Sequence, residues 1–170
     1  MTLPDRSVRR PTFAEVFADA SLPGVSAWID GLKGKIDPYL YDKFKASLPD
    51  GKDGTLLGLL TALAHKSKSP LVMVNDLQTV LDWPVNDDLY DILKSHATYV
   101  DAVTLRRQTI EWVMKTGTRF NPKVGEQITF YDTTKNMHRG GTVKSVDKPI
   151  ATAIVQVGDV KVAVEAERVA

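Results

Sequence analysis

The spacing of apolar residues changes once along the chain, and this change limits the possible folds more than any other feature. From Thr12 to Gly117, apolar side chains recur every three or four residues, as they do along one face of an α-helix. After Gly117 they alternate with polar ones, so that Ile128 and Phe130 in the segment GEQITFYD share one face of a strand. The sequence therefore predicts an α+β chain in which a helical part is followed by an antiparallel β part.

Capping residues mark the expected helices of the first part. Thr12 and Glu15 form a capping box before a short helix over 13–20, and Leu22-Pro23-Gly24 is expected to end it. A second helix is expected around 25–32. Further helices are expected to start after four more caps, and the last is one long helix, or two with a break near 95–98, ending at Gly117. These caps are Asp37, Thr55, Ser69 and Asn86.

Short runs of Val, Ile and Thr punctuated by Gly, Asp and Pro predict tight hairpins in the last third of the chain. A polar loop, 132–141, is expected after the first strand, and Gly158-Asp159 reads as a two-residue hairpin turn. The closing EAERV is expected to turn the chain into a final pairing strand. Such short strands fit a small barrel. The strands are expected over 125–132, 142–146, 150–157 and 160–165.

Four motifs of this part resemble those of the SH3-like barrels, in particular the KOW-like and Tudor-like versions. They are VGEQITFYD, RGGTVKSV, ATAIVQVGDVKVAV and EAERV, within residues 123–170. Such barrels occur in transcription, translation and chromatin proteins and at the ends of bacterial and phage accessory proteins. The resemblance implies an SH3-like antiparallel β-barrel over 118–170. The residues before it predict a flexible basic arm over 1–11 and an all-α helical domain over 12–117, which resembles no known family.

The residue types argue against catalysis. The 170-residue chain has no cysteine, which excludes disulfides, thiolate metal sites and a cysteine nucleophile. The three histidines, His65, His96 and His138, lack the spacing that places two metal ligands on one helical face. No glycine-rich phosphate-binding motif occurs. We therefore expect a protein that is not an enzyme and needs no metal or other cofactor.

Charge and hydropathy limit the partners. The net charge of +1 gives no general attraction to nucleic acid or to an anionic membrane. The apolar run Thr55–His65 is far shorter than the ~20 residues of a membrane-spanning helix. The N-terminus lacks the apolar core of a secretory signal. We expect a cytoplasmic chain with no membrane association.

Two groups of cations are candidate binding sites for a partner. The first surrounds Tyr131, where a ring beside cations suits stacking on bases and neutralisation of phosphates. The second lies in the N-terminal arm, which would order on binding. Both groups can also be read as ordinary solvated surface charges. The candidate residues are Tyr131, Lys135, His138, Arg139 and Lys144 in the first group and Arg6, Arg9 and Arg10 in the second.

Two functions fit these features. One is a non-enzymatic protein–protein adaptor or regulatory protein, such as a phage or mobile-element accessory protein acting on a host protein. The alternative is a nucleic-acid or ribonucleoprotein-binding module that uses the barrel and the basic arm. Residues 118–170 carry eight Lys and Arg against six Asp and Glu. Because phosphate contacts supply most non-specific nucleic-acid affinity, this balance favours a protein partner.

Overall fold

The computed structural model describes residues 8–49 and 55–170. The chain forms two compact units, which are described separately. One is the helical unit, Pro11–Arg106, and the other is the C-terminal unit, which joins Arg107–Ala170 to the arm up to Arg10. The helical unit is thus inserted, along the sequence, into the C-terminal unit. The division falls inside a helix, earlier than the expected boundary after Gly117.

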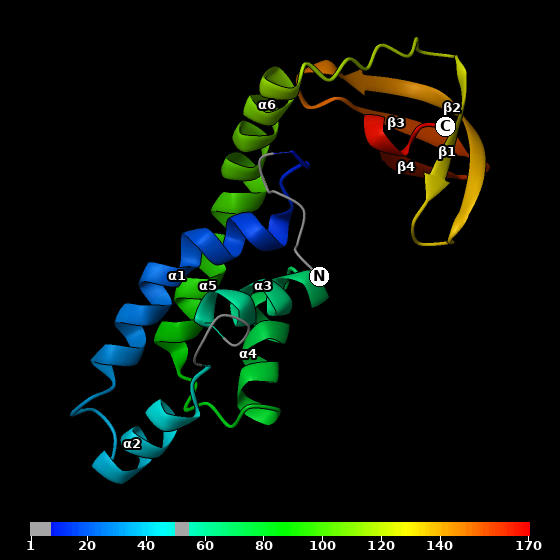
Figure 1. The fold of residues 1–170 in the computed structure, drawn as a ribbon. Coiled ribbons are helices and arrows are strands. Elements are labelled where there is room, and N and C mark those ends of the chain that lie inside the picture. Colours follow the sequence, from blue (N-terminus) through cyan, green and yellow to red (C-terminus); the bar gives the residue numbers. More distant parts are fainter. Residues whose placement is uncertain (1–7, 50–54) are drawn as a thin grey trace. The chain divides into compact units, whose positions relative to one another are not determined.

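Each of the five expected capping residues starts a helix, whereas the second helix expected around 25–32 is not separate but is the second half of the first helix. The caps Thr12, Asp37, Thr55, Ser69 and Asn86 accept hydrogen bonds from backbone N–H groups in the first turn of their helices. The prediction from the capping residues is therefore confirmed. The helices (Figure 1) are α1 (Phe13–Gly31), α2 (Pro38–Ser47), α3 (Leu56–Lys66), α4 (Pro70–Thr79), α5 (Asp87–Tyr99) and α6 (Leu105–Thr116).

The expectation that Pro23 ends the first helix is wrong, because α1 continues through it to Gly31. A proline inside a helix removes one backbone hydrogen bond and costs about 3 kcal/mol. Buried side chains on both sides of Pro23, including Phe17 and Val25 at 0% exposure, belong to the same core. Burial of these side chains offsets the cost.

Of the two alternatives for the last helical segment, the structure has one long helix and no break near 95–98. Between α5 and α6 the chain stays helical through a π-helical turn, η1 (Val100–Thr104). The period widens there and α-helix resumes at Leu105. The helix then ends at Gly117, whose φ of +65° makes it the expected left-handed terminator.

Aromatic rings form one end of the core of the helical unit. Trp28 stacks on Trp83 with ring centroids 6.1 Å apart, and Phe44 meets both rings edge-on. Trp83 is only 3% exposed. The indole Nε1 of Trp28 donates a 2.9 Å hydrogen bond to Oδ1 of Asn86, the cap of α5. This bond ties α1 to the start of α5.

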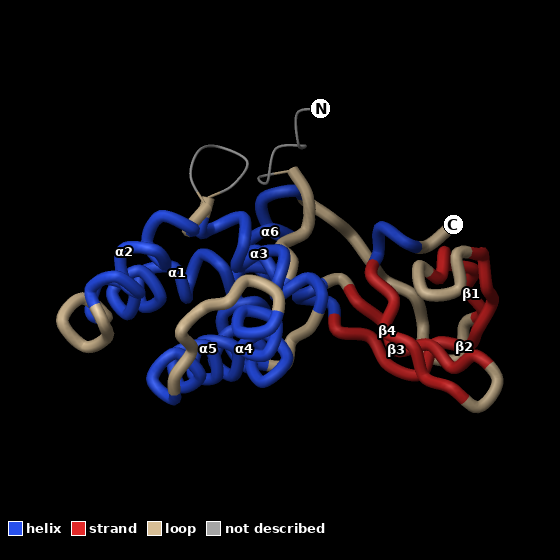
Figure 2. Tube along the Cα trace, turned by 90° about the horizontal axis from the view of Figure 1, so that it is seen from below, coloured by secondary structure: helices blue, strands red, loops and turns tan. Residues whose placement is uncertain are grey.

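The C-terminal unit contains a four-stranded antiparallel sheet in the order β1-β2-β3-β4 (Figure 2), which confirms the α+β class. The expected loop over 132–141 is too long, because β2 already starts at Met137. Short 3-10 turns, η2 and η3, follow β2 and β4. The elements are β1 (Gln127–Asp132), β2 (Met137–Asp147), η2 (Lys148–Ile150), β3 (Thr152–Val157), β4 (Val160–Glu165) and η3 (Ala166–Arg168).

The end of the chain returns to β1, as expected from EAERV. Val169 forms a single antiparallel bridge with Phe130, and the N–H of Ala170 donates to the carbonyl of Thr129 at 2.9 Å. In the described strands, β1 and β4 are not paired with each other, so the sheet is open. One face of the sheet is buried around Phe130 and Val143, both at 0% exposure.

None of the helices in the described ranges has the length and apolar composition needed to cross a bilayer.

Candidate interaction surfaces of the C-terminal unit

Asp132, at the end of β1, organises the turn that carries the first group of candidate residues. Its carboxylate is buried, and Oδ1 accepts hydrogen bonds from the N–H groups of Thr134 and Lys135 at 3.0 and 3.2 Å. Oδ2 accepts a 2.9 Å hydrogen bond from Nη1 of Arg139. The Arg139 hydrogen bond is the largest influence on the pKa of Asp132, and with the backbone bonds it lowers that pKa despite burial.

Arg139 is therefore already engaged within the unit. It lies in β2 opposite Phe130, and its side chain is 28% exposed. If the Arg139 guanidinium moved away, the buried Asp132 carboxylate would lose the charge that neutralises it, and an unpaired buried charge is strongly destabilising. Arg139 therefore has a structural role in the turn through its ion pair with Asp132.

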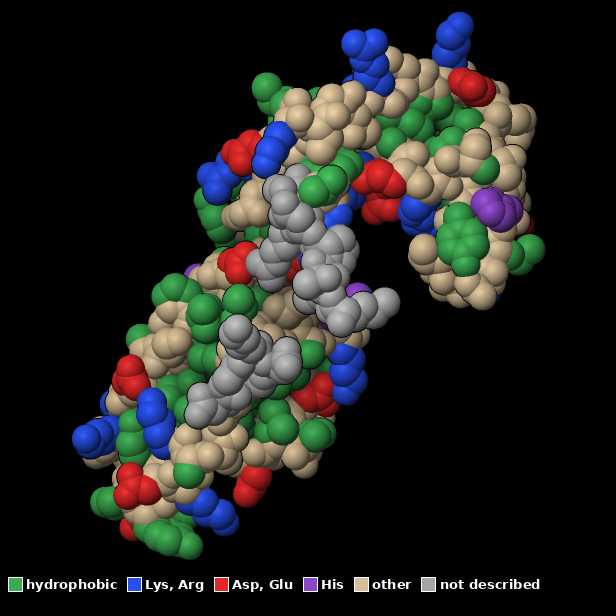
Figure 3. All heavy atoms as spheres, viewed as in Figure 1, with side chains coloured by type: hydrophobic (Ala, Val, Ile, Leu, Met, Phe, Trp, Pro, Cys, Tyr) green, Lys and Arg blue, Asp and Glu red, His purple; other side chains and the backbone are tan. Residues whose placement is uncertain are grey.

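Tyr131, Lys135 and His138 remain turned outward, and we call them the loop surface. Tyr131 and His138 are cross-strand partners whose ring centroids lie 5.3 Å apart at an interplanar angle of 67°. The Tyr131 hydroxyl is hydrogen-bonded to Oδ1 of Asn136, which has a left-handed backbone with φ of +53°. Figure 3 shows a histidine of this unit, in purple, at the surface beside a hydrophobic side chain, in green.

Lys144 does not join the loop surface. It lies at a β-bulge between Val143 and Ser145, six positions along β2 from His138. At about 3.4 Å per residue, this separation is roughly 20 Å. The prediction that Lys144 lies near Tyr131 assumed that residues 132–141 form a loop. It is wrong because β2 already starts at Met137.

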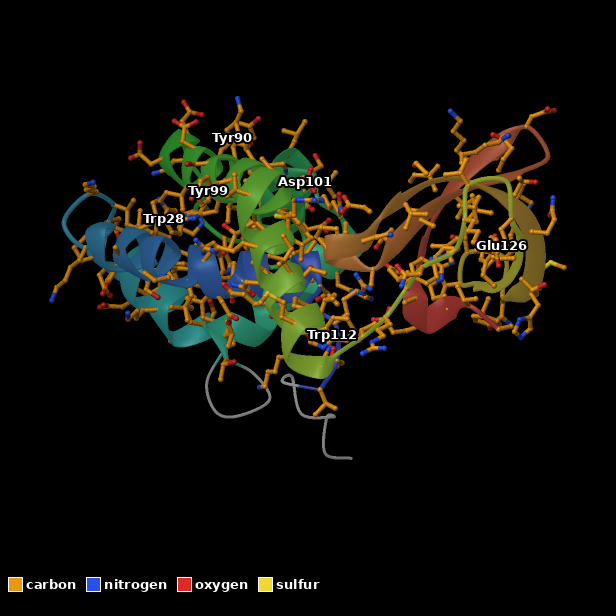
Figure 4. All side chains as sticks on the ribbon, turned by 90° about the horizontal axis from the view of Figure 1, so that it is seen from above. Trp28, Tyr90, Tyr99, Asp101, Trp112 and Glu126 are labelled. Atoms are coloured by element: carbon orange, nitrogen blue, oxygen red, sulfur yellow. The ribbon has the colours of Figure 1, made fainter. Side chains whose placement is uncertain are left out.

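Arg10 of the arm is held by the C-terminal unit. Its Nε and Nη2 bind the two carboxylate oxygens of Glu167, each at 2.9 Å. Nη1 and Nη2 donate to the carbonyls of Ile150 and Ala151 at 2.7 and 3.2 Å. The guanidinium carbon lies 5.1 Å from the ring centroid of Trp112 on α6, which is labelled in Figure 4. This arrangement satisfies most of the donors of Arg10.

Glu167 is tuned by the same contact. Burial alone would raise the pKa of this carboxyl group, but the hydrogen bonds and charge of Arg10 outweigh burial and lower it. Of the other arm candidates, Arg9 is half-buried and Arg6 lies outside the described residues. Arg10 is thus bound within the C-terminal unit, whereas Val8 of the arm is 67% exposed.

A second surface, which sequence reasoning missed, is an open groove at the β2–β3 hairpin, here called the hairpin groove. It has a volume of about 740 Å³ and combines apolar side chains with a few polar ones. The sequence feature that could have indicated this groove is the apolar pair Pro149-Ile150, but the sequence pattern assigns these residues to a turn and to the start of a strand. The groove is lined by Ser145, Val146, Asp147, Lys148, Pro149, Ile150, Thr152, Ala153, Ile154 and Ala163.

Within residues 8–49 and 55–170, no three His, Asp or Glu side chains are grouped so that they could hold a metal ion. Comparison with family models, curated proteins and solved structures finds no match to this chain. The interpretation of the candidate surfaces therefore depends on their geometry alone. They present an aromatic pair and a mixed apolar groove, both suited to contacts with another macromolecule.

Proposed function

We propose that the chain is a non-enzymatic protein–protein adaptor whose C-terminal unit is an SH3-like barrel that binds a protein target. The strand order and the return of Val169 to Phe130 support the barrel, because a final short segment paired with the first strand brings the sheet close to closure. The hairpin groove is the proposed contact surface for the target.

The main support for this proposal is that the hairpin groove is open to a partner, whereas Arg10 and Arg139 are paired with carboxylates of the same chain. Val146, Ile150 and Ile154 line an open groove that is available to apolar side chains of a partner. Arg10 and Arg139 are occupied by Glu167 and Asp132. A surface whose guanidinium groups are used internally is poorly supplied for phosphate neutralisation, whereas an apolar groove suits a protein segment.

The alternative function, nucleic-acid binding, is supported by the loop surface alone. Tyr131 and His138 offer rings on which a base could stack, and Lys135 supplies one exposed cation beside them. Because Lys135 alone would neutralise about one phosphate, the salt-dependent part of the affinity for nucleic acid would be small. We therefore rank this function second.

Site-specific photocross-linking in cells tests the adaptor proposal. A photoreactive residue at Lys148, an exposed position of the hairpin groove, should give a protein adduct that survives nuclease treatment. The matched control is Asp159, an exposed position in the β3–β4 turn outside the groove, which should give no such adduct. Equal cross-linking from both positions, or none from Lys148, would contradict the proposal.

A labelled single-stranded oligonucleotide tests the alternative on the purified full chain. Nucleic-acid binding would give an affinity that falls with salt, with a slope of about −0.7 per neutralised phosphate. Tyr131→Ala would then weaken binding by ~1 to 3 kcal/mol and leave the slope nearly unchanged, while Lys135→Ala would flatten it. The adaptor proposal expects no salt-sensitive binding at physiological ionic strength.

A further inference from the structure

The edge of the sheet at β4 presents backbone groups that β3 does not use, and the register of the two strands shows which ones they are. The N–H of Ala166 donates to the carbonyl of Ala151 at 2.9 Å, so Ala166 faces β3. Because residues of an antiparallel strand alternate in direction, the even-numbered residues of β4 also bond to β3. The N–H and C=O groups of Lys161 and Ala163 therefore point away from β3. Among the described strands only β3 pairs with β4, so these groups lie along a free edge.

One of these outward groups is already used within the unit. Nη1 of Arg168 donates a 3.4 Å hydrogen bond to the carbonyl of Ala163, and its Nε donates a 2.9 Å bond to the carbonyl of Tyr131 in β1. Arg168 thus links the two edge strands where the chain turns into η3. The N–H of Ala163 and both backbone groups of Lys161 have no partner within residues 8–49 and 55–170, and both residues are exposed. This part of the edge can accept another strand.

The hairpin groove extends to the same edge. Ser145, Ile154 and Ala163 are cross-strand neighbours on β2, β3 and β4, so their side chains form one row on one face of the sheet. All three line the hairpin groove. Ala163 is the last residue of the row and has only a methyl group, which leaves the groove open at the edge. A strand added about 4.8 Å from β4 would place a fourth side chain in this row.

We propose that the protein target binds as an extended segment that adds a strand along β4 and places an apolar side chain in the hairpin groove. This inference rests on the proposed adaptor function and states how the target is held. Hydrogen bonds to Lys161 and Ala163 supply affinity, and the groove selects the side chain next to Ala163, which can lean over the methyl group toward Ile154. A helical target is disfavoured, because its backbone groups are bonded internally and cannot reach this edge.

Lys161 adds a requirement on the charge of the target. It lies two residues before Ala163, so its side chain is on the same face as that of Ala163, and its neighbour on β3 is the uncharged Gln156. An added strand would place one of its residues opposite Lys161. Opposite charges in such cross-strand pairs are stabilising and like charges are destabilising. The target segment is therefore expected to carry an acidic residue two positions from the apolar residue that enters the groove.

Photocross-linking from the edge, in cells and on the full chain, tests the path of the target. A photoreactive residue at Lys161 should give an adduct with the same protein as one at Lys148, whereas Thr129, exposed on β1, should give none. An adduct from Lys148 without one from Lys161 would overturn the added strand and leave the adaptor function in place. No adduct from Lys148 would contradict the adaptor function, and this inference with it.

Removal of one backbone donor tests the hydrogen bonds themselves. With the photoreactive residue at Lys148, Ala163→Pro should lower the adduct yield about tenfold, because proline has no N–H and leaves a carbonyl of the target unpaired. Proline is tolerated where the N–H faces away from the neighbouring strand, and far-UV circular dichroism checks that the sheet is retained. Ala163→Val, of similar size but with its N–H, should keep most of the adduct.

A reversal of charge at Lys161 gives a second readout that does not depend on proline. Lys161→Glu should lower the adduct yield from Lys148 several-fold, because it places two acids opposite each other. Lys135→Glu, an exposed change in the loop surface, is the control. If Ala163→Pro disrupts the sheet, the Lys161 adduct and this comparison decide the outcome. A folded Ala163→Pro variant with the same yield as Ala163→Val, or equal yields from the two lysine variants, would overturn the proposal.

Discussion

At the scale of single residues, two arginines that the sequence suggests as partner-binding residues, Arg10 and Arg139, instead form ion pairs within the protein. Arg10 and Glu167 are 157 positions apart, and no local pattern connects them. Arg139 and Asp132 are seven apart, a spacing that brings residues together across a hairpin only if the turn is tight. The sequence showed the charges correctly, but their partners depend on tertiary structure.

Arg10 is predicted to stabilise the C-terminal unit. Arg10→Ala removes the bonds to Glu167 and to two carbonyls, so we expect a loss of about 1 to 3 kcal/mol in the free energy of unfolding, measured by urea denaturation. Arg10→Lys keeps the charge but not the planar fork and should recover less than half of the loss. Lys135→Ala, an exposed change in the loop surface, is expected to have no effect. Equal stability of all three variants would contradict the role of Arg10.

The lowered pKa values of Asp132 and Glu167 predict acid sensitivity of the same unit. Because the folded-state pKa of each lies below its unfolded value of about 4, the stabilisation is complete above that pH. It is lost as the pH falls through the lowered folded-state pKa. Asp132→Asn should reduce stability at neutral pH and make the acid-induced loss shallower, measured by denaturation at a series of pH values. Asp159→Asn should leave the profile unchanged.

At the scale of elements, Gly140 and Gly141 are adjacent in β2 but face different surroundings. A Cβ on Gly141 would lie 2.6 Å from both the carbonyl oxygen of Gln156 and Cγ1 of Val155. A Cβ on Gly140 would meet nothing closer than 3.9 Å. The sheet packs so closely over Gly141 that it leaves no room for a side chain.

Gly141→Ala is therefore predicted to destabilise the sheet by about 1 to 3 kcal/mol, because β3 must shift to admit the methyl group. Gly140→Ala is the matched control and should change stability by less than about 0.5 kcal/mol. Thermal unfolding followed by near-UV circular dichroism would compare the two. The register of β2 against β3 is in error if the two variants lose equal stability.

The elements also show what the sequence could and could not predict. Caps such as Asn86 act within one helical turn, so the starts of the five capped helices were predictable. The continuation of α1 through Pro23 was not, since it depends on burial against distant residues. The early start of β2 depends on pairing with β1, and the hairpin groove depends on how η2 folds over the sheet. Long-range packing decided each of these features.

At the scale of the whole molecule, the chain enters the helical unit after Arg10 and leaves it at Arg106. The two sequence segments of the C-terminal unit meet only when the protein has folded, and Arg10 makes the principal polar contacts between them. Closure of such a long loop carries an entropic cost that grows slowly with its length. The stability that the arm adds to the C-terminal unit can therefore be measured separately from that of the sheet.

The division into two units predicts how fragments will behave. Residues 11–106 should be helical alone, and residues 118–170 should give a β-type far-UV spectrum, because each contains its own buried core. A fragment of residues 107–170 keeps Trp112 but lacks Arg10, so its free energy of unfolding should fall below that of the unit in the full chain by at least the loss caused by Arg10→Ala. Urea denaturation of the fragment, the full chain and the variant gives this comparison. A fragment as stable as the unit in the full chain would show that the arm adds nothing, and strong helicity in residues 118–170 would refute the sheet.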